Sequence, residues 1–185
     1  MQEPSDLELI HQVRGGNRQA YTRLMKRYQQ RVYWTARRMV GNHHDAEDIA
    51  QETFIKAYLA LGDFRNDSSF FTWLYRITIN LSLNSMRKQQ LVSYIRESEL
   101  LSRFLPAIER PDGVMQAKEM ERRLHRAVAL LPEKQRAVFV LRFFDGLAYD
   151  EISEILKTSI GGLKANYFHA LRKIREQLKD ENQKT

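Results

Sequence analysis

The sequence contains no cysteine. This absence excludes disulfide bonds, thiolate catalysis and a cysteine-based zinc site, and it fits a reducing compartment. The chain also has no stretch near the roughly 18 consecutive apolar residues that a membrane span needs. Its start, MQEPSDLELIHQ, lacks the positive segment and apolar run of a secretory signal. We therefore expect a soluble, cytoplasmic protein with no membrane insertion.

Catalytic motifs are also missing. No nucleophile–base pairing, glycine-rich phosphate loop or internal repeat is visible. The segment from His43 to Asp48, HHDAED, raises the alternative of a metal-dependent enzyme, but the His-Glu-x-x-His spacing is absent and adjacent residues point in different directions on a helix. We interpret this segment as a polar helix entry. We expect no catalytic residue, no metal site and no cofactor.

The chain has 185 residues, of which 43% are hydrophobic, enough for packed cores in one domain or two small ones. Its formal net charge is +7 and its pI is near 9.7. Such a basic balance favours a polyanionic partner, either nucleic acid or an acidic membrane surface.

Apolar residues recur at helical spacing through the first 88 residues. Ser5 and Glu8 form a capping box before a first short helix. Its inner face would be Leu7, Ile10 and Val13, and that of the second helix Ala20, Leu24, Tyr28, Val32, Ala36 and Met39. The pattern predicts a compact helical domain over residues 1–88.

The helix expected after the turn Asn66–Ser69 carries two apolar stripes: Phe70, Leu74, Ile77 and Leu81, then Ile79, Leu83 and Met86. Between them a polar face stacks at spacings of three and four: Trp73, Arg76, Asn80, Asn84 and Arg87. Arginines neutralise phosphates, asparagines hydrogen-bond base edges and an exposed indole stacks on an unpaired base. This face is either a single-stranded nucleic-acid surface or an ordinary polar face with Trp73 in the core.

The helix expected to start near Asp45 carries an acidic face. This face consists of Asp45, Asp48 and Glu52, with Gln51 beside them. Acids in the first turn suit the helix dipole, which accounts for Asp45 and Asp48 but not for Glu52. In a basic protein, such a face is also suited to a positively charged protein partner.

The helical pattern weakens over residues 89–116, where Pro106, Pro111 and Gly113 interrupt it. We expect a linker there, although it contains Val92, Ile95, Leu100, Leu101, Phe104, Leu105 and Ile108. A second helical domain follows over residues 117–185. The fold class is therefore all-α, with two small helical domains joined by a linker.

The second domain contains the layout of a helix-turn-helix. A short helix from about Tyr149 to Leu156 is followed by the turn Lys157–Ser159 and a longer helix from Ile160, with Ser159 as its cap. The residues expected to close one core are Ile152, Ile155, Leu156, Ile160, Leu163, Tyr167, Leu171 and Ile174. The outer side of the second helix carries small, polar and basic residues that suit DNA: Gly162, Lys164, Ala165, Asn166, Phe168, His169, Arg172 and Lys173.

Taken together, these motifs resemble a bacterial sigma factor of the extracytoplasmic-function (ECF) group. DAEDIAQETFIKAY is similar to the family's polymerase-docking segment, and FRNDSSFFTWLYRITIN to its promoter-melting segment. The stretch from Leu131 to Leu178 is similar to its C-terminal DNA-binding domain. The resemblance covers nearly the whole chain except the linker, and it implies a subunit that directs promoter-specific transcription initiation, in a stress or envelope response.

The resemblance also implies roles for residues. Asp45, Asp48, Gln51, Glu52 and Phe54 are expected to bind the beta-prime clamp helices of core RNA polymerase. Trp73, Arg76, Asn80, Asn84, Arg87 and Lys88 are expected to bind the −10 promoter element. The helix from Ser159 to Lys173 is expected to enter the major groove of the −35 element, and an anti-sigma protein is an expected partner.

Two positions depart from the family pattern. Ala148 stands where a Ser or Thr would cap the first helix of the motif, and we expect Asp150 to compensate in part. The usual Gly-Thr-Val-Lys-Ser-Arg reads GGLKAN here, so an arginine contact with DNA is missing. The alternative function is a stand-alone helix-turn-helix regulator, which usually binds duplex DNA as a symmetric dimer. That reading leaves the acidic face and the Trp73 face unexplained.

Overall fold

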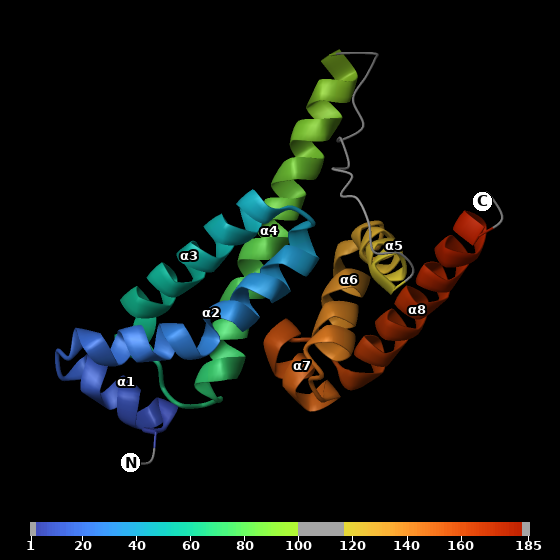
Figure 1. Ribbon diagram of the computed structural model, residues 1–185. Coiled ribbons are helices and arrows are strands. Elements are labelled where there is room, and N and C mark those ends of the chain that lie inside the picture. The colour runs from blue at the N-terminus through green and yellow to red at the C-terminus, as the bar shows by residue number, and fades with distance from the viewer. Residues whose placement is uncertain (1–2, 100–116, 183–185) are drawn as a thin grey trace.

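The computed structural model describes residues 3–99 and 117–182, and within these ranges it is all-helical, as predicted (Figure 1). The N-terminal unit contains α1 (Asp6–Arg14), α2 (Arg18–Val40), α3 (His43–Ala60), the 3-10 turn η1 (Leu61–Asp63) and α4 (Phe70–Glu99). The C-terminal unit contains α5 (Ala117–Ala129), α6 (Glu133–Phe139), the π-helical segment η2 (Val140–Phe144), α7 (Tyr149–Leu156) and α8 (Ile160–Asn182). Residues 100–116, most of the expected linker, lie outside the described residues.

Local capping sets the starts of the first helices. The Ser5 hydroxyl accepts a hydrogen bond from the Glu8 amide, and the Glu8 carboxylate accepts one from the Ser5 amide, which lowers the pKa of Glu8. Asn17 caps α2 through the Gln19 amide at 3.1 Å, and Gly41 ends α2 in the left-handed region at a φ of 85°. The predicted capping box is confirmed.

The core of the N-terminal unit follows the predicted stripe of α2, whose six members are all buried. In α1, Ile10 is buried but Leu7 is 49% exposed, and Leu9 takes the inward position instead. The expectation for Leu7 was therefore wrong. It rested on spacing alone, and a nine-residue helix crossing α2 buries a narrower face than its apolar residues mark out.

α4 also buries hydroxyl groups that the apolar stripes did not include. Thr78 donates to the Leu74 carbonyl at 3.0 Å and Ser82 to the Thr78 carbonyl at 2.8 Å, and both side chains are fully buried. Because each hydroxyl is satisfied within the helix, it can enter a core without a partner elsewhere. The helix continues past Lys88 to Glu99, into the stretch assigned to the linker.

The helix-turn-helix is confirmed at its predicted bounds, with Lys157 in the left-handed region at a φ of 52°. Ile152, Ile155, Leu163 and Ile174 are buried as expected. Ile160 and Leu171 are 37% and 38% exposed, so their expected burial was wrong. The neighbouring Ala170 is buried instead, on the side of α8 that packs in the core.

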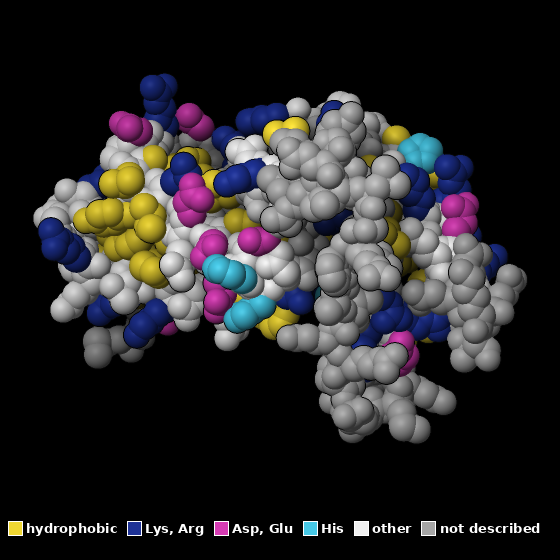
Figure 2. All heavy atoms as spheres, turned by 90° about the horizontal axis from the view of Figure 1, so that it is seen from above, with side chains coloured by type: hydrophobic (Ala, Val, Ile, Leu, Met, Phe, Trp, Pro, Cys, Tyr) yellow, Lys and Arg dark blue, Asp and Glu magenta, His cyan; other side chains and the backbone are white. Residues whose placement is uncertain are grey.

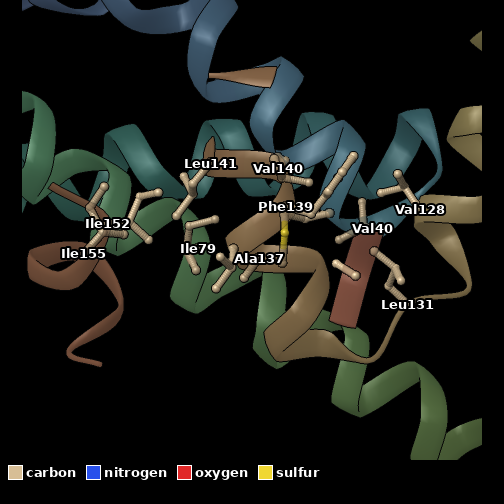
Figure 3. Packing of buried hydrophobic residues seen from close by; sticks show 14 of the residues in the cluster. Val40, Ile79, Val128, Leu131, Ala137, Phe139, Val140, Leu141, Ile152 and Ile155 are labelled. Carbon is tan, nitrogen blue, oxygen red and sulfur yellow. The ribbon is translucent and has the colours of Figure 1, made fainter. Parts of the chain in front are cut away.

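The two units share one hydrophobic core, which we call the inter-unit core. It joins residues of α2 and α4, among them Met39, Val40 and Ile79, to residues of α6, η2 and α7. Figure 3 shows Ile79 of α4 facing Leu141, Ile152 and Ile155 of the C-terminal unit. α4 contacts α6 and α7, while α2 contacts α5 and η2, so the C-terminal unit lies against both long helices (Figure 1).

Polar contacts across this junction centre on Asp145. Its carboxylate accepts a hydrogen bond from the Thr35 hydroxyl at 2.8 Å and pairs with Arg38 at 3.5 Å. Tyr75 lies beside Thr35, at 3.4 Å between their hydroxyl oxygens. Burial raises the pKa of Asp145 to about 6, although Thr35 and the cations Arg38 and Arg31 oppose the shift. We call Thr35, Arg38, Tyr75 and Asp145 the Asp145 cluster.

Candidate functional site

A wide apolar groove runs between α2 and α3 on the N-terminal unit. Its volume is about 890 Å³. On its α3 side, Leu59 is 76% exposed and Ile55 is 59% exposed. Figure 2 shows a hydrophobic patch on this unit, with acidic and histidine side chains at its border. Exposed large aliphatic side chains around a concave surface mark an interaction site rather than a solvated helix face.

The five predicted docking residues divide into three groups. Gln51 and Phe54 line the groove, and Phe54 is only 6% exposed, with its carbonyl accepting a hydrogen bond from the Tyr21 hydroxyl. Asp48 and Glu52 do not line the groove, but they are exposed on α3 and adjoin Glu47 and Gln51, which do line it. Within the helix, Asp48 lies 3.4 Å from His44 and Glu52 lies 3.3 Å from Lys56.

Asp45 has a structural role in this arrangement. Its amide donates to the Asn42 side chain that caps α3 at 2.9 Å, and its carboxylate accepts from the side chains of Asn42 and Gln89. The carboxylate therefore links the start of α3 to α4. Asp45 is engaged within the chain and is less available to a partner than Asp48 or Glu52.

Sequence reasoning missed half of the groove. Met25 and Gln29 of α2 line it, as do Tyr33 and Arg18. Tyr21, Met25 and Gln29 are spaced four apart beside the buried stripe of α2, so the signal was present in the sequence. A second side of the groove could have been predicted only by knowing that α2 packs alongside α3.

The predicted nucleic-acid face of α4 begins with Trp73, which is half-buried. Its ring lies 5.0 Å from Phe64 and 5.8 Å from Phe70, centroid to centroid. The indole ring thus packs partly in the core, in agreement with the alternative that Trp73 is a core residue. The rest of the ring is exposed to solvent. Ser69 caps α4 by accepting from the Thr72 amide at 3.0 Å, which confirms that the Asn66–Ser69 turn supplies the cap.

The loop before α4 is held from α1. The Arg14 guanidinium donates to the carbonyl of Leu61 at 3.0 Å and also to that of Phe64. Asn66 then adopts a left-handed φ of 60°, a conformation that Asn tolerates better than most residues. The loop therefore has a fixed course, and through Phe64 it supports the Trp73 ring.

The C-terminal unit contacts two of the three cations on the α4 face. Arg76 donates to the Glu154 carbonyl of α7 at 3.1 Å. Arg87 pairs with Glu133 of α6 at 3.0 Å. Asn80, Asn84 and Lys88 remain exposed. Sequence reasoning placed these residues on one face but gave no indication that another part of the chain would lie along its edge.

The helix-turn-helix presents its outer face to solvent. Ser159 caps α8 by accepting from the Gly162 amide at 3.3 Å, as predicted. At the start of α7, Asp150 lies in the first turn, where its charge suits the helix dipole. Glu151, which the sequence analysis did not name, also compensates for Ala148, because its carboxylate accepts from the Ala148 amide at 2.8 Å.

Most of the predicted −35 residues are accessible on α8. Lys164, Ala165, Phe168, His169 and Arg172 are exposed, and Lys173 is partly exposed. Asn166 donates to the Gly162 carbonyl at 2.9 Å and is partly engaged within the helix.

Local packing explains why position 162 is a glycine. A Cβ placed there would lie 3.2 Å from the Thr158 methyl group and 3.3 Å from the Ser159 hydroxyl. The small residue therefore fits the turn of the motif, whatever else α8 contacts.

Across residues 3–99 and 117–182, no group of three or more His, Cys, Asp or Glu side chains is placed to hold a metal ion. In the same ranges, no helix is long and apolar enough to cross a membrane.

Comparisons with known proteins identify the family of the chain. The family model described as Sigma-70 region 2 matches residues 24–92, and that described as Sigma-70, region 4 matches residues 121–174. The RNA polymerase sigma-H factor of Pseudomonas aeruginosa is 34% identical over 183 residues, covering 95% of each chain. The ECF RNA polymerase sigma factor SigW of Bacillus subtilis is 34% identical over 178 residues, covering 92% of this chain and 95% of that one.

A solved structure shows the same fold. CnrH in complex with the cytosolic domain of CnrY superposes with a TM-score of 0.69 at 24% identity, covering 93% of this chain and 96% of that one. With two sigma-70 regions in order and relatives matched along nearly their whole length, the chain belongs to the ECF RNA polymerase sigma factors, non-enzymatic proteins that bind core RNA polymerase and promoter DNA and direct transcription initiation.

Proposed function

We propose that core polymerase docks in the groove between α2 and α3, with Gln51 and Phe54 lining it and the exposed acids Asp48 and Glu52 on the same helix. The observation that carries this assignment is the exposure of Ile55 and Leu59 in the groove lining. Apolar side chains supply affinity at the centre of an interface, and charges at its edge supply orientation and a faster encounter. The occupant is therefore a helical segment of polymerase with a basic flank.

The promoter contacts follow from the exposed faces of α4 and α8. Trp73, Asn80 and Asn84, together with Arg76, Arg87 and Lys88, would bind the unpaired strand of the −10 element. The α8 face from Ser159 to Lys173 would enter the major groove of the −35 element. The units would be residues 1–88 and 117–185, with α4 extending to Glu99 between them.

Regulation and location are proposed from the same family. A sigma factor acts with polymerase, so we infer that this one works in the cytoplasm, in a stress or envelope response. An anti-sigma protein is an inferred partner. The sigma factor RpoE of Bartonella quintana, which superposes on this chain with a TM-score of 0.67, was solved in complex with the anti-sigma factor NepR.

The docking proposal is tested by placing a charge in the groove. We expect Leu59→Asp to weaken binding to purified core polymerase at least about tenfold, because the carboxylate must be desolvated in an apolar interface. Leu7→Asp is the matched control, since Leu7 is an exposed leucine outside the groove. Binding is measured by fluorescence anisotropy of the labelled chain. Equal affinities for the two variants would remove the groove assignment.

A further inference from the structure

The loop that joins η1 to α4 leads directly into the −10 face, and it is held at its two ends. At its start, Leu61 and Phe64 are buried, and the Phe64 amide donates to the Leu61 carbonyl at 3.3 Å. At its end, Ser69 caps α4. Among the residues that the structure describes, residues 65–68 make no hydrogen bond to another segment. The course of the loop therefore depends on how firmly its ends are fixed.

The space beside the loop adds to this dependence. A cavity of about 550 Å³ lies between the loop, α1 and α2. Asn66 and Ser68 of the loop line it, together with Leu7 of α1 and Tyr28 of α2. Close packing is what normally fixes a side chain and the backbone that carries it, and the cavity removes that support on one side of the loop. The middle of the loop therefore takes its position from the ends.

Arg14, the last residue of α1, fixes the start of the loop from outside it. Its guanidinium donates to the Leu61 carbonyl through Nη2 at 3.0 Å and Nε at 3.2 Å, and also to the Phe64 carbonyl. A planar fork of donors holds two carbonyls in one orientation, which an ammonium group cannot do. A cation in the last turn of a helix also suits the helix dipole, but that effect needs no carbonyl 47 residues away.

The orientation of the Phe64 backbone sets the support of the Trp73 ring. The Phe64 ring lies 5.0 Å from the Trp73 ring and 6.0 Å from the Phe70 ring, centroid to centroid. A rotation of the backbone at Phe64 would carry its ring away from the indole and leave Trp73 without one of its two aromatic neighbours. A continuous set of contacts thus runs from the Arg14 guanidinium to the indole at the start of the −10 face.

We infer that Arg14 is a positioning residue for capture of the unpaired −10 strand, although it lies on α1 and outside the −10 face. It acts through the loop and Trp73, without touching DNA. This inference rests on the proposed function for the role of Trp73. Loosening the loop should slow promoter opening, because a displacement of about 1 Å at a positioned group can cost as much as about 100-fold in rate. The docking groove, which α2 and α3 alone line, should be unaffected.

The test uses a Trp34→Phe parent, in which Trp73 is the only tryptophan of the chain. Arg14→Ala removes the fork, and Arg14→Lys keeps the charge without the fork. Arg23→Ala is the matched control, since Arg23 is an exposed arginine of α2 that does not line the groove. Four quantities are measured: acrylamide quenching of Trp73 fluorescence in the free chain, melting temperature, affinity for core polymerase, and the rate at which a promoter with a fluorescent base in its −10 element opens.

We expect Arg14→Ala to increase the quenching of Trp73 and to slow promoter opening at least about tenfold. Core polymerase affinity should stay within about twofold of the parent, because the groove is a separate site. The melting temperature should fall by no more than a few degrees, since Leu61 and Phe64 remain buried. Arg14→Lys should be intermediate in quenching and in opening, because an ammonium group cannot hold both carbonyls as the fork does. If Arg14→Ala does not fold, this variant decides the question.

Opening at the parent rate by Arg14→Ala would overturn the inference. Slowed opening with unchanged Trp73 quenching would overturn it as well. In that case Arg14 would contact DNA directly, and its loss would reduce the slope of log affinity against log salt by about one.

Failure of the proposed function looks different from failure of this inference. If the −10 face were wrongly assigned, Trp73→Ala and Asn80→Ala would open the promoter as fast as the parent. The quenching of Trp73 in the free chain would still report whether Arg14 holds the loop, because it needs neither polymerase nor promoter.

Discussion

Acid should strengthen the contact between the two units through Asp145. In the closed chain this carboxyl group is buried against α2, where Thr35 donates to it and Arg31 and Arg38 face it, with Tyr75 alongside. Burial is the largest influence and raises its pKa to about 6 from an ordinary value of 3.8. When the units separate, the carboxyl group returns to water and its pKa returns to the ordinary range.

The sign of this pH dependence follows from which state, closed or open, binds the proton more tightly. Because the pKa is higher in the closed chain, the contribution of Asp145 to closure is fully present below the open-state pKa and is lost as the pH rises through about 6. From these two values, the closing equilibrium constant should rise about tenfold, or about 1.4 kcal/mol, between pH about 7.5 and about 5. Asp145→Asn should remove this dependence, since an amide cannot ionise.

Protonation of His125 should weaken the contact between the two units in acid, which opposes the effect of Asp145. Its ring stacks on Phe144 at 5.7 Å, and burial, together with Arg37 and Arg38 across the junction, lowers its pKa. A lowered pKa means that its contribution to closure is present at neutral pH and is lost in acid. The comparison must therefore be made in a His125→Gln background, with and without Asp145→Asn.

The assay is energy transfer between two dyes, one on each unit. Lys26→Cys on α2 and Lys179→Cys on α8 are exposed positions in a chain that otherwise has no cysteine. The closed fraction is followed from pH about 5 to about 7.5, the window set by the shifted pKa of Asp145. If His125→Gln alone shows the same pH response as His125→Gln with Asp145→Asn, the reasoning about Asp145 is refuted.

Three further predictions concern single surfaces. Replacing Asp48 and Glu52 together by Lys should weaken core polymerase binding several-fold at low salt and less at high salt, because exposed charges act mainly on encounter; equal affinity in a salt titration would contradict it. Asn80→Ala should slow opening of a fluorescent −10 promoter without lowering the melting temperature, since the side chain is exposed; normal opening would return this face to plain surface. Ser159→Ala should destabilise the C-terminal unit by about 1 kcal/mol in a denaturant titration, because the α8 cap is lost; Ser159→Asp keeps a capping oxygen and should largely preserve stability.

The sequence predicted well those structural features that depend only on residues close together in the chain. The capping box at Ser5 and the bounds of the helix-turn-helix depend on groups a few residues apart, so the pattern of side chains is sufficient. The buried stripe of α2 was also predictable, because a long helix with one apolar face has a single way to bury it.

Predictions failed where burial depends on a neighbouring helix. Leu7 and Leu171 lie at helical spacing but are exposed, while Ala170, the neighbour of Leu171, is buried. Thr78 and Ser82 are buried although they are polar, because each hydroxyl bonds to a carbonyl one turn earlier. Spacing predicts a face, but only the packing partner selects which residues of that face are covered.

The family could thus be recognised from the sequence, because the order of an acidic helix, a Trp–Asn–Arg helix and a helix-turn-helix is a pattern of neighbouring residues. The joint groove of α2 and α3, the engagement of Arg76 and Arg87, and the burial of Asp145 needed the tertiary structure. Each of these brings together residues far apart in the chain, such as Thr35 and Asp145. No local periodicity encodes such a contact, because it depends on how two independently patterned helical units pack against each other.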